Sequence, residues 1–452
     1  MGEVKGVFTQ LSSTVVRSVV RSIVVIAFVA FLCVSAAPAE AETYSRANTT
    51  ADGAQSVGPA SRGTISDDGT LVAFHSPSGD LVPNDTNGVA DVFVKDLTSG
   101  SITRVSTDFA GNQANNRSTF AQISPDKKYV VFQSLASNLV PNDTNGKTDI
   151  FMKSLITGEI SRISVASDGS QANGDSRFPQ IGMDSTGQPR YVVFQSDSSN
   201  LVSGDSNRSW DVFIRDLQLQ TTERISVSST GGQGNNFSVR PTIGGAGCKI
   251  VFHSWATNLV GNDTNGKADV FLRDRCARNT SRISTSSTGG QGNGDSQFGR
   301  ISASGNVVVF HSTASNLVSA DTNRVRDTFV KILATGVTER VSVSSAGLEA
   351  DGATGFGYPS ADGSYIYFHG TASNLDPVDT NGLQDVFVRD RNVHTTRLVS
   401  ATTDTTNPSA NGISGSPYCS RDGSIVVFQS QASNLVSGDT NNAQDVFVRR
   451  RP

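Results

Sequence analysis

The stretch "NDTNGVADVF", from Asn84 to Phe93, decides the fold because it occurs, with substitutions, seven times along the chain. The other copies are "NDTNGKTDIF" from Asn142, "GDSNRSWDVF" from Gly204, "NDTNGKADVF" from Asn262, "ADTNRVRDTF" from Ala320, "VDTNGLQDVF" from Val378 and "GDTNNAQDVF" from Gly438. Successive copies begin about 60 residues apart, and a regular internal period of that length indicates one repeated unit. We therefore expect a single repeat domain, although a chain of 452 residues would otherwise suggest two or three domains.

Each repeat is predicted to contain four short β-strands. In the second repeat the strands are expected over residues 120–124, 129–134, 149–155 and 160–165, with a long loop after the second strand. Other repeats carry Asp-Gly in the first turn, as at Asp68-Gly69 and Asp422-Gly423, which is a strong hairpin signal between apolar runs. Helices are disfavoured because the chain has 43 Gly and its acids are mostly Asp, which favours turns. The fold class is expected to be all-β.

Two phenylalanines recur in every repeat. The second strands carry Phe74, Phe132, Phe194, Phe252, Phe310, Phe368 and Phe428, and the third strands carry Phe93, Phe151, Phe213, Phe271, Phe329, Phe387 and Phe447. A small isolated sheet cannot bury both of its faces, whereas a closed ring of such sheets can. This pattern predicts a seven-bladed β-propeller of four-stranded blades.

The two ends of the repeat region predict how the ring closes. The last repeat ends at "DVFVRRRP" and lacks a fourth strand. The segment "ETYSRANTTADGAQS", from Glu42 to Ser56, aligns with fourth-strand segments of other repeats, and Arg46 matches Arg282. We therefore expect residues 43–50 to pair beside residues 445–451, so that the N-terminal strand closes the last blade.

The repeat also resembles a known family. Its Asp-Gly turn and following strand are seen in "ISDDGTLVAF" from Ile65, "ADGSYIYF" from Ala361 and "SRDGSIVVF" from Ser420. These segments resemble the TolB-like, WD40-like (PD40) propeller repeat family, over about residues 43–452. The resemblance implies a propeller that serves as a binding scaffold or as a domain of a hydrolase. Because no separate α/β domain precedes the blades in this sequence, it implies no role in the Tol-Pal envelope system.

The first 41 residues differ in kind from the repeats. Lys5, Arg17 and Arg21 precede an apolar run over residues 23–34, and Ala39-Glu40-Ala41 fits an A-x-A cleavage site. These features predict a signal peptide over residues 1–41 and an exported propeller over residues 42–452, in the periplasm or outside the cell. A membrane anchor is the alternative, but the run is shorter than the roughly 20 apolar residues that cross a bilayer. We expect no stable membrane insertion after the signal is removed.

The charge of the chain excludes one class of partner. The formal net charge is -4 at pH 7, and such mild acidity gives no electrostatic basis for binding nucleic acid or anionic lipid. The remaining candidates are protein, peptide and glycan partners, and we expect a monomer.

The loop between the second and third strands is about fourteen residues long, whereas hairpin loops usually have two to five. Its recurrent aspartates and asparagine are candidate calcium ligands, because calcium prefers six to eight carboxylate, amide, carbonyl and water oxygens. The candidate residues are Asp85, Asn87, Asp91, Asp143, Asn145, Asp149, Asp205, Asn207, Asp211, Asp263, Asn265, Asp269, Asp321, Asn323, Asp327, Asp379, Asn381, Asp385, Asp439, Asn441 and Asp445.

A second interpretation of these loops is purely structural. The position where calcium loops usually begin with Asp is occupied by Pro83, Pro141, Ser203, Gly261, Ser319, Pro377 and Ser437. Asp and Asn also accept hydrogen bonds from nearby backbone N–H groups and so organise turns without a metal. Most copies place Gly or Asn at a position that suits a left-handed turn residue, but Arg208 and Arg324 depart from this rule. Both interpretations remain open at this point, with the structural one favoured.

No catalytic motif is recognisable. The residue after the second-strand phenylalanine is His75, Gln133, Gln195, His253, His311, His369 or Gln429. Since Gln replaces His as a neutral hydrogen-bonding group but not as a general base, these histidines are predicted to be structural. The chain contains neither a G-x-S-x-G nor an H-E-x-x-H motif. No catalytic residue is predicted, and an enzyme is the less favoured reading.

Two further features are predicted to be structural. Arginines recur in the fourth strands and are expected to bond to carboxylates such as Asp96, Asp216 or Asp274; they are Arg104, Arg162, Arg224, Arg282, Arg340 and Arg397. Cys248 begins the second strand of its blade and Cys276 ends the third, so antiparallel pairing predicts a disulfide between them. Cys419 has no expected partner.

Three functions are compatible with this sequence. The favoured hypothesis is an exported, non-catalytic propeller that binds a protein, peptide or glycan at the loop face around the channel, where Gly, Asn and Gln form a neutral rim. The alternatives are a calcium-stabilised envelope or surface scaffold, and a propeller lyase or hydrolase acting at the channel mouth. Clustered acids, bases or histidines that do not repeat would favour the enzyme.

Overall fold

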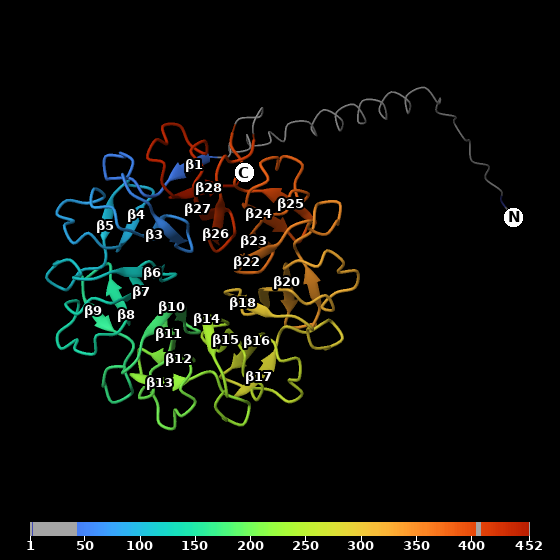
Figure 1. Ribbon diagram of the computed structural model, residues 1–452, viewed down its shortest axis with the longest axis horizontal. Helices are drawn as coiled ribbons and strands as arrows, with labels where there is room; N and C mark the ends of the chain where they lie inside the picture. Colours follow the sequence, from blue (N-terminus) through green and yellow to red (C-terminus); the bar gives the residue numbers. More distant parts are fainter. Residues whose placement is uncertain (1, 3–42, 404–407, 452) are drawn as a thin grey trace. The chain divides into compact units, whose positions relative to one another are not determined.

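The computed structural model of the protein describes Gly2, residues 43–403 and residues 408–451. The predicted signal peptide lies outside the described residues, as does its boundary at residue 41. In the described part of the chain, 28 β-strands form seven four-stranded antiparallel sheets around a ring (Figure 1). This arrangement confirms the predicted all-β, seven-bladed propeller.

The four strands of each blade follow one another from the channel outward. The blades are numbered one to seven in the chain order of their innermost strands. The innermost strands are β2 (Ser61–Ile65), β6 (Ser118–Ile123), β10 (Ser176–Met183), β14 (Ser238–Gly244), β18 (Ser296–Ile301), β22 (Thr354–Pro359) and β26 (Ser414–Cys419). The second strands are β3 (Leu71–Ser76), β7 (Tyr129–Ser134), β11 (Pro189–Ser196), β15 (Lys249–Ser254), β19 (Val307–Ser312), β23 (Tyr365–Gly370) and β27 (Ile425–Ser430).

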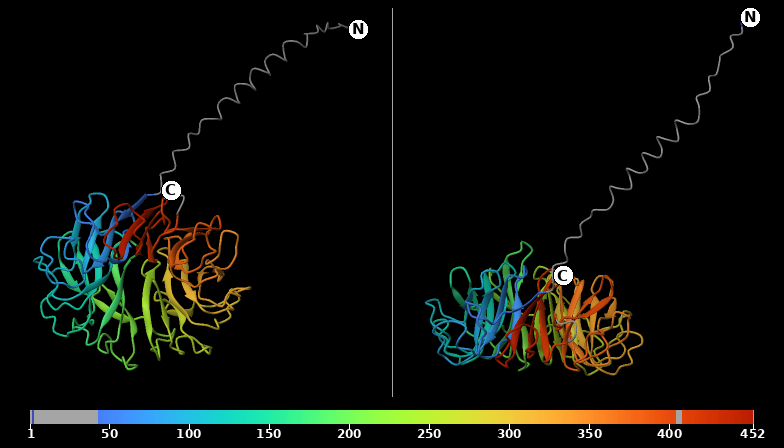
Figure 2. Two further views of the ribbon diagram at one scale, coloured as in Figure 1. Left: turned by 45° about the horizontal axis from the view of Figure 1, so that its top comes forward. Right: turned by 90° about the horizontal axis from the view of Figure 1, so that it is seen from above.

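The outer half of each blade contains the third and fourth strands. The third strands are β4 (Asp91–Asp96), β8 (Asp149–Ser154), β12 (Asp211–Asp216), β16 (Asp269–Asp274), β20 (Asp327–Ile332), β24 (Asp385–Asp390) and β28 (Asp445–Arg450). The outermost strands are β5 (Ile102–Arg104), β9 (Ile160–Arg162), β13 (Thr221–Arg224), β17 (Asn279–Arg282), β21 (Thr338–Arg340), β25 (Thr395–Leu398) and β1 (Thr43–Arg46). Figure 2 shows the sheets standing side by side around the ring.

The recurrent phenylalanines form the core between blades. Within a blade the two rings face each other across the second and third strands; Phe132 and Phe151, for example, are fully buried with ring centroids 5.9 Å apart. Each apolar cluster contains residues of two consecutive blades, as where Val94 of blade one packs with Phe132 of blade two. Burying such a ring contributes roughly 1.5–3 kcal/mol, so the neighbouring blades stabilise one another.

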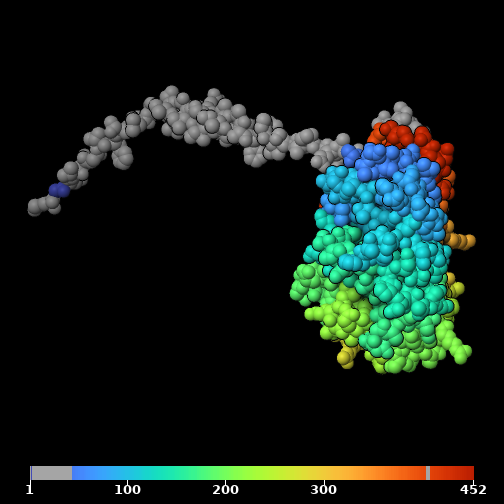
Figure 3. Space-filling model, turned by 90° about the vertical axis from the view of Figure 1, so that its left-hand side faces the viewer, coloured from blue at the N-terminus to red at the C-terminus, as the bar shows by residue number. Residues whose placement is uncertain are grey.

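The N-terminal strand closes the ring as predicted. Strand β1 pairs antiparallel with β28, and Arg46 lies opposite Phe447 in the same register as Arg282 opposite Phe271. An apolar cluster joins Val427 and Val446 of blade seven to Phe74 and Phe93 of blade one. In Figure 3 the segments next to the two ends of the propeller are in contact.

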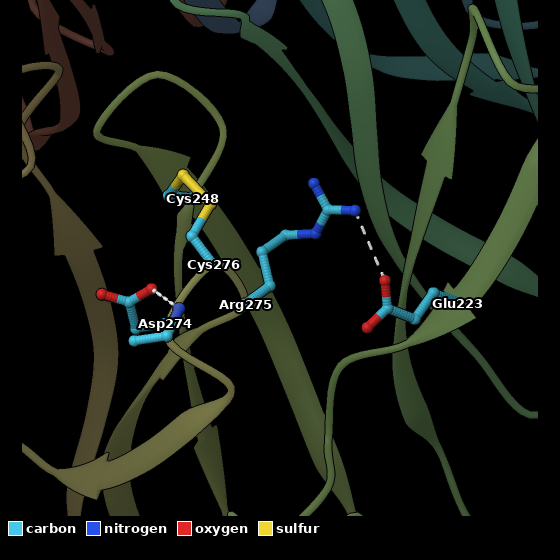
Figure 4. Close-up of a disulfide and its surroundings, with 6 residues drawn as sticks. Glu223, Cys248, Asp274, Arg275 and Cys276 are labelled. Atoms are coloured by element: carbon cyan, nitrogen blue, oxygen red, sulfur yellow. Dashed lines mark hydrogen bonds and ion pairs between the residues drawn. A yellow bond between two sulfur atoms is a disulfide. The ribbon is translucent and has the colours of Figure 1, made fainter.

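Blade four contains a disulfide that the other repeats lack. Cys248 and Cys276 are joined at a Cα–Cα distance of 5.3 Å, next to the ends of β15 and β16. Figure 4 shows Arg275, beside Cys276, extending towards Glu223 of blade three, where the ion pair is 3.4 Å long. Cys419 is buried and is not in a disulfide. The disulfide therefore links two strands within one blade, away from the channel.

Among the described residues, no helix is long and apolar enough to span a membrane.

Candidate functional site

The innermost strands share an unusual backbone feature. One non-glycine residue in each strand has a left-handed φ between 51° and 57°, beside a shift in register with the second strand. These residues are Arg62, Phe120, Phe178, Arg240, Phe298, Phe356 and Ser416. A left-handed conformation costs an L-residue about 1–2 kcal/mol. Strain of this kind persists only where the surrounding structure holds it, and it often occurs at functional sites.

Hydrogen bonds from the neighbouring blade hold this conformation. The N–H of Arg240 donates to Oε1 of Gln195 at 2.8 Å, and the N–H of Phe298 donates to Nδ1 of His253 at 3.3 Å. The equivalent bonds join Arg62 to Gln429, Phe178 to Gln133, Phe356 to His311 and Ser416 to His369. His75 is the exception, because its Nδ1 has no hydrogen-bond partner among the described residues. The position therefore requires a neutral acceptor, which explains why Gln and His alternate there.

The histidines are neutral for a physical reason. Burial, followed by the nearby charge of Arg240, lowers the pKa of His253 to about 3. Burial likewise lowers the pKa of His75 and of His369 to about 4. An imidazole with such a low pKa is uncharged at neutral pH, and its tautomer with the proton on Nε2 leaves Nδ1 able to accept the backbone bond.

The side chains of the left-handed residues line a cavity in the channel. The cavity has a volume of about 110 Å³ and is lined by residues of all seven innermost strands. Arginine and aromatic side chains dominate its wall: the guanidinium of Arg240 lies 3.5 Å from the ring centroid of Phe178 and 5.1 Å from that of Phe298. Arg62 lies 5.3 Å from the centroid of Phe120. These contacts are cation–π interactions, which orient the arginines without neutralising them.

Arg300 and Tyr418 also line the cavity, and Tyr358 packs against both of them. Arg300 lies 5.2 Å from the ring centroid of Tyr358, whose ring is 3.9 Å from that of Tyr418. The hydroxyl of Tyr418 accepts a hydrogen bond of 2.9 Å from Nε2 of Gln122. Burial raises the pKa of both tyrosines, so the phenols stay protonated at neutral pH.

The cavity has an excess of positive charge. Arg62, Arg240 and Arg300 belong to its wall, and no carboxylate or histidine is among the described residues that line it. Burial lowers the pKa of Arg240, and the charges of Arg62 and Arg300 lower it further. Burial also lowers the pKa of Arg62, with a contribution from Arg300. Guanidinium groups that repel one another in a partly dry site are favourable for binding an anion.

The loops between the second and third strands, named D-T-N loops after their Asp-Thr-Asn segment (Asp-Ser-Asn in blade three), differ in character from the channel wall. Each asparagine donates from Nδ2 to the second aspartate of its loop at 2.7–3.1 Å. Its Oδ1 accepts the N–H two residues further on at 2.7–3.2 Å, which forms an Asx turn. The asparagines therefore serve as turn residues that also hold the second aspartate.

In six blades an arginine occupies the place between the two aspartates of the loop. In blade one, Arg104 lies 3.1 Å from Asp85 and 3.9 Å from Asp91. The same contacts to the first and second aspartates are made in blades two to five and seven, at 3.2–3.8 Å and 3.0–3.9 Å, by Arg162, Arg224, Arg282, Arg340 and Arg46. A guanidinium thus supplies the positive charge that a calcium ion would supply.

Two expectations about the fourth-strand arginines were wrong. Their partners are the loop aspartates, and not Asp96, Asp216 or Asp274, because the alternation of the strand directs these side chains towards the loop. Arg397 does not belong to the set: it lies opposite Val388, whereas Leu398 stands opposite Phe387, where the other blades have arginine. The one-residue difference in register places Arg397 on the exposed face.

The left-handed loop position is also more regular than the sequence indicated. Gly88, Gly146, Gly266, Gly382 and Asn442 have positive φ, and so do Arg208 and Arg324, at 54° and 59°. Within the described residues, no group of three or more His, Cys, Asp or Glu side chains is arranged to hold a metal ion.

Sequence reasoning did not identify the channel arginines. Arg62, Arg240 and Arg300 do not recur with the period, and a search for repeated residues overlooks them. A usable signal was present, because Arg62, Phe120 and Phe178 stand at the same distance before the second-strand phenylalanine of their repeats, allowing for the longer third repeat. A repeated position that carries large side chains of different types indicates residues that line a cavity, whereas a position with one residue type indicates a structural role.

Comparison with known proteins places the chain by fold. No family model matches it, and no curated protein matches it in sequence. An oligogalacturonate lyase in complex with manganese is similar with a TM-score of 0.53 and 13% identity, over 91% of this chain and 96% of that chain. The propeller domain of the Trilobed protease from Pyrococcus furiosus, described as having an open velcro topology, has a TM-score of 0.52 and 12% identity, over 86% and 94%. One of two prolyl endopeptidases has a TM-score of 0.52 and 8% identity, over 83% and 46%. At such identities these likenesses define a β-propeller and nothing finer.

Proposed function

We propose that the protein is an exported, non-catalytic binding protein that takes an anionic group of a protein, peptide or glycan into the propeller channel. The observation that carries this proposal is the group of three channel arginines with no carboxylate among the described lining residues. Export rests on the predicted signal peptide and is consistent with the disulfide, since disulfides persist in oxidising compartments.

The size of the cavity supports the capture of one end of a larger ligand. Its volume of about 110 Å³ is below the roughly 300 Å³ from which small-molecule pockets start. A carboxylate or a single acidic sugar ring is of suitable size, while the rest of the ligand would contact the loops around the channel. The phenyl rings of Phe178 and Phe298 offer an apolar face beside the charge. An acidic glycan or the C-terminal carboxylate of a peptide meets both requirements.

The composition of the wall favours binding over catalysis. The clustered, non-repeating side chains in the channel are arginines, and no carboxylate or histidine is among the described lining residues. Arginines are bases, but a guanidinium is protonated at neutral pH and cannot accept a proton there. Proton transfer at neutral pH would need a group whose pKa lies near 7. The tyrosines of this region have a raised pKa and do not provide such a group.

The test compares anionic and neutral ligands that otherwise match. We expect acidic oligosaccharides to bind more tightly than neutral ones of equal length, or peptides with a free C-terminal carboxylate to bind more tightly than their amides, in titration calorimetry. Arg240→Gln should weaken that binding about 10- to 100-fold, because a hydrogen bond to a charged group contributes about 1.5–3 kcal/mol. Arg421→Gln is the matched control, since Arg421 is paired with Asp67 on the exposed surface.

Three results would oppose the proposal. One is equal affinity for charged and neutral ligands. Another is unchanged binding by Arg240→Gln when its thermal unfolding shows that it is folded. The third is a change in mass of the bound ligand after incubation with the protein, which would favour the enzyme alternative.

A further inference from the structure

Blade six departs from the other blades at the loop that carries the paired aspartates. Leu398 replaces the arginine that lies between the two aspartates elsewhere. Ser409 stands where the other blades have Gln or Glu, as the bridge between Ala401 and Ser409 shows. Asp376 occupies a position that is valine in every other copy of the loop. Two long side chains are thus replaced by shorter ones, and one carboxylate is added.

The substitutions leave a buried carboxylate oxygen without a partner. Asp379 is 7% exposed, and its Oδ1 has no hydrogen-bond partner among residues 43–403 and 408–451. The equivalent aspartates of blades one and seven, Asp85 and Asp439, contact Arg104 at 3.1 Å and Arg46 at 3.2 Å. Asp385 is fully buried beside Asp379; it is held by Ser400 at 2.5 Å and by Asn381 at 2.7 Å. The pair is held by the same kinds of hydrogen bond as in the other blades, but in the described part of the chain no arginine pairs with it.

The electrostatics of blade six agree with this geometry. Burial raises the pKa of Asp385 to about 6, and the charge of Asp379 adds to the effect. Burial also raises the pKa of Asp379, and Asp376 and Asp351 add to it. An isolated buried carboxylate is costly unless an opposite charge accompanies it. The other six blades satisfy this requirement with arginine.

We propose that the loop of blade six binds one divalent cation, of the calcium class, between Asp379 and Asp385, at the place that arginine fills in the other six blades. The six arginine-filled loops bind none. The site is a second one, separate from the channel cavity, and it does not depend on the ligand proposed above.

The donor chemistry favours calcium over transition metals. The oxygens at hand are the carboxylates of Asp379 and Asp385, the hydroxyl of Ser409 and the carbonyl of Val378, which accepts a bond of 2.9 Å from that hydroxyl. Only two acids contribute, so water would complete the shell, and calcium accepts such mixed oxygen ligands. Few charged ligands imply weak binding, with a Kd on the order of 10⁻⁴–10⁻³ M, as in extracellular calcium modules.

The test first measures how many calcium ions bind to each chain and then introduces an arginine at the proposed cation site of blade six. In titration calorimetry with CaCl₂, we expect the wild-type protein to bind one calcium ion per chain. Calcium at about tenfold excess over Kd should also raise the melting temperature by about 1–3 °C. Asp379→Asn should abolish both effects, whereas the matched change in blade four, Asp263→Asn, should leave calcium binding unchanged.

Leu398→Arg gives the decisive comparison. It installs the guanidinium of the other blades, so the variant should no longer bind calcium and should be more stable than the calcium-free wild type. If Asp379→Asn does not fold, Leu398→Arg still tests the site, because it adds a favourable charge. Absence of calcium binding at about 10 mM would overturn the proposal. Binding that survives Leu398→Arg, or a stoichiometry near seven, would overturn it as well.

Discussion

The D-T-N loops and the channel wall are both repeated seven times, but they repeat in different ways. In the loops the side chains recur with the backbone, and an arginine fills the place between two aspartates in six of seven copies. In the channel only the backbone recurs: the same left-handed residue is Arg in two blades, Phe in four and Ser in one. Positions with the same side chain in nearly every blade therefore have a structural role. Positions where the side chain varies on a constant backbone form the surface that can bind a specific ligand.

Blade six differs from the other six blades in its D-T-N loop. Its loop keeps both aspartates and the asparagine, but it has Leu398 in place of arginine. The departure does not relax the other positions, since Asp385 stays fully buried. The paired aspartates therefore remain buried in blade six without the arginine that accompanies them in the other blades, and the proposed cation site rests on this observation.

The largest effect on stability is expected from the phenylalanines that form the core between blades. Phe132→Ala should lower the free energy of unfolding by about 3–5 kcal/mol, because it leaves a cavity between blades one and two. Urea unfolding measures the loss. Phe109→Ala is the control, since Phe109 is 70% exposed, and it should change the stability by less than about 0.5 kcal/mol. Equal losses for the two variants would contradict the role of the phenyl rings as the contact between blades.

The next effect tests the arginine of the loops. Arg282→Leu reproduces the blade-six residue in blade four and should cost about 3 kcal/mol, because it leaves Asp263 and Asp269 buried without a cation. Arg397→Leu is the matched control on a fourth strand, where the arginine is exposed and out of register. Urea unfolding in EDTA should show a loss for Arg282→Leu alone. A similar loss for both variants would mean that the guanidinium stabilises through its aliphatic stem.

The histidines behind the channel wall predict a dependence of stability on pH. Their pKa is lowered to about 3 for His253 and about 4 for His75 and His369, mainly by burial. Below pH 6.5 the unfolded chain takes up protons that the folded protein does not. The contribution of these histidines to stability should therefore fall as the pH decreases from 6.5 towards 4, by about 1.4 kcal/mol per pH unit for each histidine.

His253→Gln isolates one of these contributions. Gln accepts the same N–H in blades that lack His, as Gln195 does for Arg240 at 2.8 Å. The variant should be within about 1 kcal/mol of the wild type at pH 7.5 and should lose less stability on acidification. Urea midpoints between pH 7.5 and 4.5 measure the difference. Burial raises the pKa of Asp149 and of Asp385 to about 6, which favours folding at low pH, but these groups act equally in both proteins and cancel. A parallel loss in the two proteins would show that His253 does not titrate with unfolding.

The fold was predictable from the sequence because the period and the paired phenylalanines report directly on buried contacts between blades. The closing strand was predictable from Arg46, whose match to Arg282 holds in the register of β1. The channel was not predictable, because its wall consists of side chains that differ from blade to blade, and neither the left-handed residue nor the shift in register of each innermost strand is visible in the sequence. Blade six was misread for a related reason: Arg397 and Leu398 are neighbours, and only the pairing with β24 decides which of them faces the loop.

The smallest effect concerns the left-handed turn of the loops. Arg208 has a φ of 54° at a position that is Gly266 in blade four, with a φ of 64°. Arg208→Gly should stabilise the protein by about 0.5–1 kcal/mol, because glycine adopts this conformation without the penalty of a Cβ atom. Gly266→Ala is the reverse control and should cost a similar amount, since a Cβ at Gly266 would meet no atom within 4 Å and the backbone alone decides the cost. If both changes were neutral in urea unfolding, the conformation of this turn would not limit the stability of the protein. The D-T-N loops would then not differ from the channel wall in their contribution to stability.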